Sequence, residues 1–220
     1  MDNKRNTLQN DELFIRSDQY NFIKFQVNNL VHAHTTVKDN NVLHALKYSA
    51  FDKVMNLFPD SHENKKDIFH KIIEIEESAV AEEFLTDVKT YVIPFKEITD
   101  KKIQKLFPKA KKLKVPPLDK MDFKELSYIG WYDIRSERKY LIFDYQDRLI
   151  GIQGTFTESI QGICSLCNSY EDVGLFMSNV KSGKETYTNR GNYICKDSQT
   201  CNQNIITLDK LNNFISILKK

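Results

Sequence analysis

Glycine and histidine are missing from opposite halves of the chain. All seven glycines lie at or after Gly130, and all five histidines lie at or before His70. A first half without glycine is typical of helices, because glycine supplies the positive φ angles that tight turns need. The glycine-containing half is typical of strands joined by turns. We therefore expect an α+β protein.

Long apolar runs and nucleotide-binding loops are also missing. No run approaches the roughly 18–20 apolar residues of a membrane span, and the first residues, "MDNKRNTLQNDELF", lack the apolar core of a signal peptide. Neither GxxxxGK[ST] nor GxGxxG occurs. The composition is that of a globular protein, with 40% apolar and 28% charged residues and a net charge of +2. We expect a cytoplasmic protein with no membrane association.

Apolar residues repeat at helical spacing through the first half of the chain. Four amphipathic segments are predicted, over residues 20–34, 43–58, 68–75 and 80–91. A fifth, shorter helix is predicted to begin at Thr99 or Asp100. Short connections between such segments favour an antiparallel bundle.

Two adjacent prolines, Pro116 and Pro117, stop helices and force an extended connection. We therefore predict a boundary there. Residues 1–115 would form an N-terminal helical bundle with a basic linker helix, and residues 116–220 a C-terminal mixed α/β lobe.

The second half carries a different pattern of apolar residues. Strands are predicted over residues 125–133, 139–145, 149–156, 173–180 and 186–195. The segments "QDR" and "KSGKE" are the expected hairpin turns. A C-terminal helix is predicted from Thr207 as its N-cap, with a stripe of four apolar residues, Leu211, Phe214, Ile215 and Leu218.

Cysteine is scarce, and the four present all lie between residues 164 and 201. Cys164 and Cys167 form a C-x-x-C pair, whose spacing lets both sulfurs face one ion. A predicted hairpin follows, then Cys195 and Cys201. A knuckle, a hairpin and two further ligands at the start of a helix is the order of a treble-clef zinc finger. Four cysteine ligands close the coordination sphere, so the metal would be one structural Zn²⁺.

Other roles for these thiols remain open at this point. Disulfides are uncommon in a reducing compartment, and the pair does not follow the strand of a βαβ unit, as a redox C-x-x-C does. Ordinary buried cysteines are a further alternative, and the five residues between Cys195 and Cys201 are more than the common two to four. No histidine follows His70 to act as the base of a cysteine nucleophile. We therefore expect no enzyme.

The segment "KKIQKLFPKAKKLK" (residues 101–114) is strongly basic. It carries seven lysines and no acidic residue, at positions 101, 102, 105, 109, 111, 112 and 114. A solvated helix and linker is one interpretation, and an electrostatic patch for RNA or an acidic partner is the other. Leu106, Phe107 and Leu113 within it are expected to dock on the body of the protein.

Three stretches in order resemble a known family. They are "SYIGWYDIRSERKYLIF", "IQGTFTESIQGICSLCNSYEDVGLFMSN" and "YTNRGNYICKDSQTCNQN", and they resemble the FusB-type fusidic acid resistance proteins, or elongation factor G-binding proteins. The Gly-Trp pair at 130–131, the Arg-Lys-Tyr at 138–140 and the cysteine spacing occur together. The resemblance covers residues 90–220 well and the helical half more weakly.

The resemblance implies a helical bundle followed by a four-cysteine treble-clef zinc finger, with Cys164, Cys167, Cys195 and Cys201 as ligands. It also implies binding to elongation factor G and its release from ribosomes that fusidic acid has stalled, a target-protection form of antibiotic resistance. The ribosome would be a transient partner, and we expect a monomer. The alternative is a ribosome- or RNA-associated zinc-finger protein that uses the basic segment.

The resemblance further implies four contact residues for the factor, namely Ile163, Arg190, Tyr193 and Phe214. Ile163 stands where the family usually has an aromatic residue. Arg190 replaces a lysine and keeps its charge.

Overall fold

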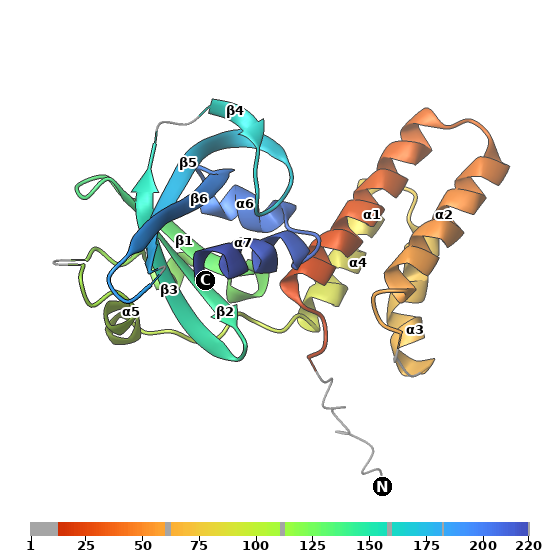
Figure 1. Ribbon diagram of the computed structural model, residues 1–220. Coiled ribbons are helices and arrows are strands. Elements are labelled where there is room, and N and C mark those ends of the chain that lie inside the picture. Colours follow the sequence, from red (N-terminus) through yellow and green to blue (C-terminus); the bar gives the residue numbers. More distant parts are fainter. Residues whose placement is uncertain (1–12, 60–62, 111–112, 158–159, 182, 220) are drawn as a thin grey trace, which may run out of the picture. The chain divides into compact units, whose positions relative to one another are not determined.

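The computed structural model describes residues 13–59, 63–110, 113–157, 160–181 and 183–219 (Figure 1). Lys111 and Lys112 of the basic segment lie outside these ranges. The chain forms two compact units, which are described separately. The first holds Gln26–Ile93 and the residues before Ser17, and the second holds Ser17–Phe25 and Pro94–Lys220.

The first unit is helical, as the sequence predicted. Its elements, with the first helix shared between the units, are α1 (Ser17–Thr36), α2 (Asn40–Met55), α3 (Glu63–His70), the 3₁₀ turn η1 (Lys71–Glu74) and α4 (Ser78–Thr90). Fully buried Val54, Phe69, Ile72 and Val88 form its apolar interior. The rings of Phe58 and Phe69 stack with centroids 5.0 Å apart. Burial of these side chains holds short helices that would be marginal alone.

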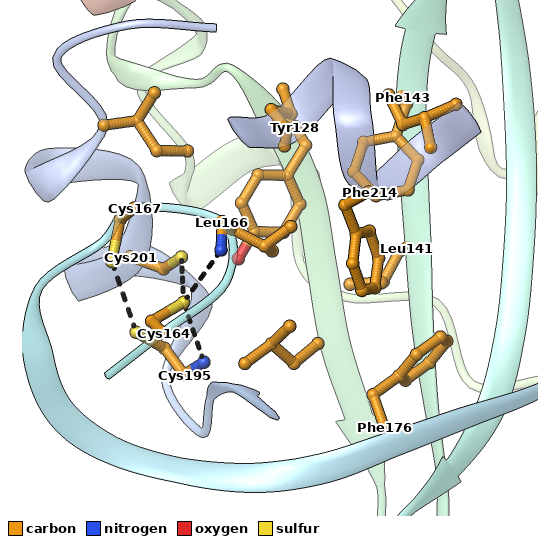
Figure 2. Packing of buried hydrophobic residues seen from close by; sticks show 14 of the residues in the cluster. Tyr128, Leu141, Phe143, Cys164, Leu166, Cys167, Phe176, Cys195, Cys201 and Phe214 are labelled. Carbon is orange, nitrogen blue, oxygen red and sulfur yellow. Dashed lines mark hydrogen bonds between the residues drawn. The ribbon is translucent and has the colours of Figure 1, made fainter. Parts of the chain in front are cut away.

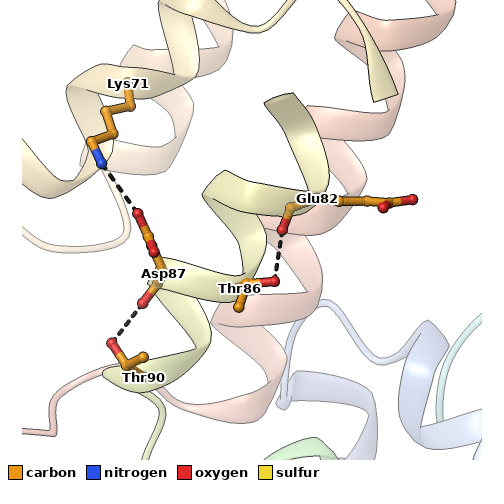
Figure 3. Close-up of polar contacts among 5 residues, drawn as sticks. All are labelled: Lys71, Glu82, Thr86, Asp87 and Thr90. Atoms are coloured by element: carbon orange, nitrogen blue, oxygen red, sulfur yellow. Dashed lines mark hydrogen bonds and ion pairs between the residues drawn. The ribbon is translucent and has the colours of Figure 1, made fainter. Parts of the chain in front are cut away.

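The surface of α4 carries polar contacts that are exposed to water. Lys71 Nζ lies 3.1 Å from Asp87 Oδ2, and this ion pair raises the pKa of Lys71 (Figure 3). The hydroxyls of Thr86 and Thr90 donate to the carbonyls of Glu82 and Asp87, at 2.8 and 2.6 Å. Exposed ion pairs stabilise a fold little. This face is therefore a solvated surface of the unit.

The second unit is built on an antiparallel sheet. Its helices are α5 (Asp100–Leu106), η2 (Leu118–Lys120), η3 (Phe123–Glu125), α6 (Ser198–Asn204) and α7 (Asp209–Lys219). Its strands are β1 (Tyr128–Asp133), β2 (Arg138–Tyr145), β3 (Arg148–Phe156), β4 (Ile160–Ile163), β5 (Tyr170–Lys181) and β6 (Tyr187–Cys195). The strand order is β1-β2-β3-β5-β4, and β6 also pairs with β5. The curled sheet is seen in Figure 1.

Local signals in the sequence predicted most of these elements. The "QDR" turn joins β2 to β3, with positive φ at Gln146 and Asp147. Thr99 caps α5, its hydroxyl accepting from Lys102 N at 3.3 Å. The C-terminal helix begins at Asp209 rather than after a Thr207 cap, although Thr207 Oγ1 accepts from Asp209 N at 3.4 Å. Strand β4 was not predicted, because four residues give too short a pattern.

Residues 94–115 belong to the second unit, although the sequence predicted them with the helical bundle. The reason is apolar packing, because Phe95, Ile103 and Phe107 bury against Tyr140 and Ile142 of the sheet. Leu106 and Leu113 also pack against this cluster, which confirms that the basic segment docks on the body of the protein. The compact unit thus begins before the predicted boundary.

The start of α1 also belongs to the second unit, and hydrogen bonds give the reason. Asn21 is buried, and its side-chain amide donates to the carbonyls of Asn202 and Ile205 at 2.7 and 2.9 Å.

Among the described residues, no helix is long and apolar enough to cross a membrane.

Candidate metal centre and docking surface

The first cysteine pair lies in the tight turn between β4 and β5. Cys164 N donates to Ser169 O at 3.0 Å, and Asn168 N donates to Cys164 O at 2.9 Å. Asn168 takes a left-handed backbone conformation, with φ 62°, which asparagine tolerates better than most residues. Leu166 N points at the Cys164 sulfur, 3.3 Å away. Such backbone donors stabilise a thiolate, so this turn is built to hold a charged ligand.

The second pair comes from the end of β6 and from α6. Cys195 closes β6, and its N–H lies 3.3 Å from the Cys164 sulfur. The carboxylate of Asp197 caps α6, accepting from the N–H groups of Gln199 and Thr200 at 3.1 Å each. Cys201 follows in the next turn of this helix. The five residues between Cys195 and Cys201 therefore contain the N-cap of α6 and the start of its first turn. This local structure brings Cys201 back to the other thiols.

The four sulfurs lie together in a buried cluster (Figure 2). All are within 4.8 Å of one another, with 3.8 Å between Cys164 and Cys201 and 3.7 Å between Cys167 and Cys195. A disulfide needs about 2.05 Å, so these are free thiols. Four ligands at about 2.3 Å around a tetrahedral zinc ion place their sulfurs about 3.8 Å apart. The observed spacing fits that geometry.

Charge also favours a metal ion in this cluster. Contacts with the other three thiols lower the pKa of Cys164 well below its ordinary value, and its thiolate raises the pKa values of Cys195 and Cys201. Four neighbouring thiolates repel one another unless a cation lies among them. All four are buried, whereas reactive redox cysteines are exposed. The cluster thus has the donors, spacing and burial of a structural zinc site, with no open position for a substrate.

Lys139 of β2 is a buried cation beside this cluster, which sequence reasoning did not identify. It is 0% exposed, and its ammonium donates to the carbonyls of Cys195 and Lys196 at 3.0 and 2.7 Å. No carboxylate in the described part of the chain lies within ion-pair distance of it. Burial outweighs the opposing effect of the neighbouring Cys201, Cys195 and Asp197, and so lowers its pKa from 10.5 to about 8. The thiolates, together with the Asp197 carboxylate, therefore supply the negative charge around this ammonium.

Asn202 fixes α6 to β1 and was also not identified from the sequence. Its side-chain oxygen accepts from Ser127 N and Tyr128 N at 2.7 and 3.2 Å. Its amide nitrogen donates to Tyr128 O and Ser198 O, both at 2.9 Å. The signal in the sequence was its place directly after Cys201. A buried amide with four partners fixes the angle at which α6 presents that cysteine.

Ile163 and Tyr193 lie on the surface beside the cluster, 56% and 41% exposed. The N–H of Ser165 in the cysteine turn donates to Tyr193 O at 2.9 Å and so links the two segments. Tyr170, the cross-strand neighbour of Ile163, is 66% exposed. Tyr170 was not identified from the sequence, although its position just after the C-x-x-C turn could have indicated it. We name Ile163, Tyr170 and Tyr193 the docking surface.

The other two predicted contact residues lie differently. Arg190 is half-buried on β6, and its guanidinium donates to Ile217 O at the end of α7, 3.0 Å away. Phe214 is 3% exposed and packs with Phe143 and Phe176 in the apolar cluster that includes the cysteines (Figure 2). Phe214 was expected to contact the partner directly. The structure corrects this expectation, because the side chain lies in the core beneath the surface.

The comparisons with known proteins agree with this architecture. One family model, described as "Elongation factor G-binding protein, N-terminal", matches residues 14–96. A second, "FBP C-terminal treble-clef zinc-finger", matches residues 104–214. Among curated proteins, none matches.

A solved structure is similar over nearly the whole length of both chains. It is described as "Structure of the fusidic acid resistance protein FusC" and is 30% identical, with a TM-score of 0.81. The match covers 94% of this chain and 98% of that chain. The cysteine cluster of this chain falls within the zinc-finger match, and the four cysteines hold one structural zinc ion. The two family matches together cover both the helical unit and the metal centre. The chain therefore belongs to the elongation factor G-binding protein family, the FusB-type fusidic acid resistance proteins.

Proposed function

We propose that this protein binds elongation factor G through the docking surface and speeds release of the factor from ribosomes stalled by fusidic acid. The observation that carries the proposal is the exposure of Ile163, Tyr170 and Tyr193 around a rigid metal centre, in a chain of this family. Exposed aromatic and aliphatic side chains on a rigid support are typical of interface hot spots. The protein acts by binding and modifies neither the drug nor the factor.

Release follows from a difference in affinity between two states of the factor. The drug and the ribosome both stabilise one conformation, so the factor leaves slowly. A partner speeds departure only when it binds more tightly to a conformation that holds the ribosome less well. The zinc finger suits this task because its metal fixes the surface before binding, which reduces the ordering cost of association. The protein works as a monomer that meets the ribosome transiently.

Arg190 and Phe214 have separate roles in this proposal. Arg190 donates to the carbonyl of Ile217 near the end of α7 and is only half-buried. It therefore supplies charge at the edge of the interface and fixes the helix end. Phe214 supports the surface from the core, where it packs against Phe176 of β5.

A binding assay with purified elongation factor G tests the first step. Tyr193→Ala and Ile163→Asp are expected to weaken binding at least tenfold with zinc still bound, because each removes a hot-spot contact. Matched controls on the same unit are Tyr187→Ala and Ile134→Asp, since both side chains are exposed and neither belongs to the docking surface. Equal losses in variants and controls would contradict the assignment of the surface, and no binding by the unaltered protein would refute the partner.

Release of the factor tests the second step. Ribosomes carrying elongation factor G and fusidic acid are sedimented with and without the protein, and the factor left on the ribosome is measured. We expect the unaltered protein to shift the factor into the supernatant and Tyr193→Ala to do so less at equal concentration. Binding without any change in release would limit the function to association.

A further inference from the structure

A groove of about 870 Å³ opens on the second unit between β3, β5 and the end of α7. Four exposed cationic residues lie along it, and no aspartate or glutamate is among its lining residues. The cations come from segments far apart in the sequence, namely Lys109, Arg138, Lys181 and Lys219. The docking surface lines no part of this groove.

The groove exists because β3 and β5 separate after a short stretch of pairing. The two strands pair only through Thr155 with Met177 and Phe156 with Phe176. At the next position a Cβ on Gly154 would overlap the carbonyl of Met177, so only glycine permits this close approach. Ser178 then bonds to the backbone of β3 instead of continuing the ladder, its hydroxyl donating to Gln153 O at 2.9 Å. A fixed opening between the strands results.

The four cations are free to meet a ligand. Within the described ranges none of them lies within ion-pair distance of a carboxylate. Lys219 Nζ stands 4.4 Å from the ring centroid of Tyr145, which positions it without neutralising its charge. Like charges around one concave surface raise the local positive potential, because the low-dielectric walls focus the field.

The basic segment continues this surface. Lys101, Lys102, Lys105 and Lys109 are all exposed. The neighbouring Leu106 and Phe107 pack against Gly151, one of the groove residues. Within the described part of the basic segment, Lys109 therefore lines the groove, and α5, which carries Lys101, Lys102 and Lys105, packs beside it through Leu106.

We propose that this basic groove binds a single strand of RNA. Phosphates would meet the four cations, and polar side chains of the lining would donate to phosphate and ribose oxygens, namely Gln153, Thr155, Asn179 and Asn189. Half-buried Ile150 and Ile152 form an apolar floor, and Tyr187, 59% exposed, offers a ring to a base. Cations flanking an apolar and aromatic platform are typical of single-strand binding. An acidic peptide has the charge but lacks flat bases for this platform.

The charge count gives the size of the expected effect. For single strands the slope of log K against log salt is about −0.7 per phosphate contact. Four contacts predict a slope of about −2.8, and the loss of two predicts about −1.4. The variant Arg138→Gln/Lys181→Gln removes two charges with little change in size, and it leaves the docking surface intact.

Fluorescence anisotropy of a labelled twelve-nucleotide poly-uridine RNA, titrated with the full zinc-loaded chain from 50 to 300 mM salt, tests the proposal. The matched control is Lys53→Gln/Lys66→Gln, which removes the same charge from exposed positions of the helical unit. The proposal expects a halved salt slope and at least tenfold weaker binding at 50 mM salt in the groove variant, with the control unchanged.

Three results would overturn the proposal. They are an absence of RNA binding at 50 mM salt, equal losses in the groove variant and the control, and full displacement of the RNA by polyglutamate of equal charge. The last result would identify an acidic protein segment as the occupant. Binding of elongation factor G is measured on the same variants. It is expected to stay unchanged, so that failure of either proposal is seen separately.

Discussion

The buried Lys139 provides the sharpest test of how the metal centre is held. Its ammonium bonds to the carbonyls of Cys195 and Lys196, on the turn that leads from one zinc ligand toward the other. Lys139→Met keeps an unbranched apolar side chain in the same space but removes the charge and both donors. We expect the variant to fold and to release zinc faster.

The magnitude follows from what the substitution leaves behind. The Cys195 carbonyl loses its lysine donor in a buried site, which costs about 1–3 kcal/mol, while water can reach the partly buried Lys196 carbonyl. Removal of the cation also withdraws an attraction to the metal thiolates, partly offset because a charge need no longer be buried. A net loss of about 2–3 kcal/mol is expected, which corresponds to about 30- to 140-fold faster release.

Zinc release into excess chelator, followed with a chromogenic zinc indicator, measures the effect. Lys196→Met is the matched control, because it removes a lysine from the same turn whose side chain is exposed and whose carbonyl is kept. Lys139→Arg should release zinc at a rate between those of Lys139→Met and Lys196→Met, since arginine keeps the charge with a different shape. If Lys139→Met and the control release zinc at the same rate and melt at the same temperature, the buried cation does not secure the metal turn.

Four further variants test the finger. Cys195→Ser should lose zinc, measured by metal analysis, and with it binding of elongation factor G, because the metal supplies folding energy; retained zinc and binding would contradict this. Tyr193→Ala should keep zinc and lose only binding, so a metal-free product would show that its role is structural. Phe214→Ala should cost about 3–5 kcal/mol in denaturant unfolding by opening a core cavity, and Asn202→Ala about 2–4 kcal/mol by leaving buried backbone groups unpaired; losses below 1 kcal/mol would contradict the packing described.

Local patterns predicted much of the fold because each depends on neighbours in the chain. Apolar spacing predicted the helices, and the residues of the "QDR" turn predicted the hairpin in which Gln146 and Asp147 take positive φ. Thr99 identified the start of α5. The spacing of the C-x-x-C pair predicted that its two sulfurs would face one ion. These features are fixed within a few residues.

Other features depend on residues that meet only after folding. The apolar pattern of Phe214 predicted a helix face but not whether that face meets a partner or the core, and the sheet decides this by covering it with Phe143 and Phe176. Lys139 looks like an ordinary strand lysine until β2 places it against the turn after Cys195.

The sequence alone predicted an α+β chain with four cysteines at the spacing of metal ligands, because ligand spacing and turn preference are local properties. Tertiary structure alone decided to which unit the basic segment belongs and which cation lies buried beside the thiolates. It also decided that β3 and β5 separate and leave a basic groove between them. Each of these depends on long-range packing, which brings together residues 20 or more positions apart in the sequence.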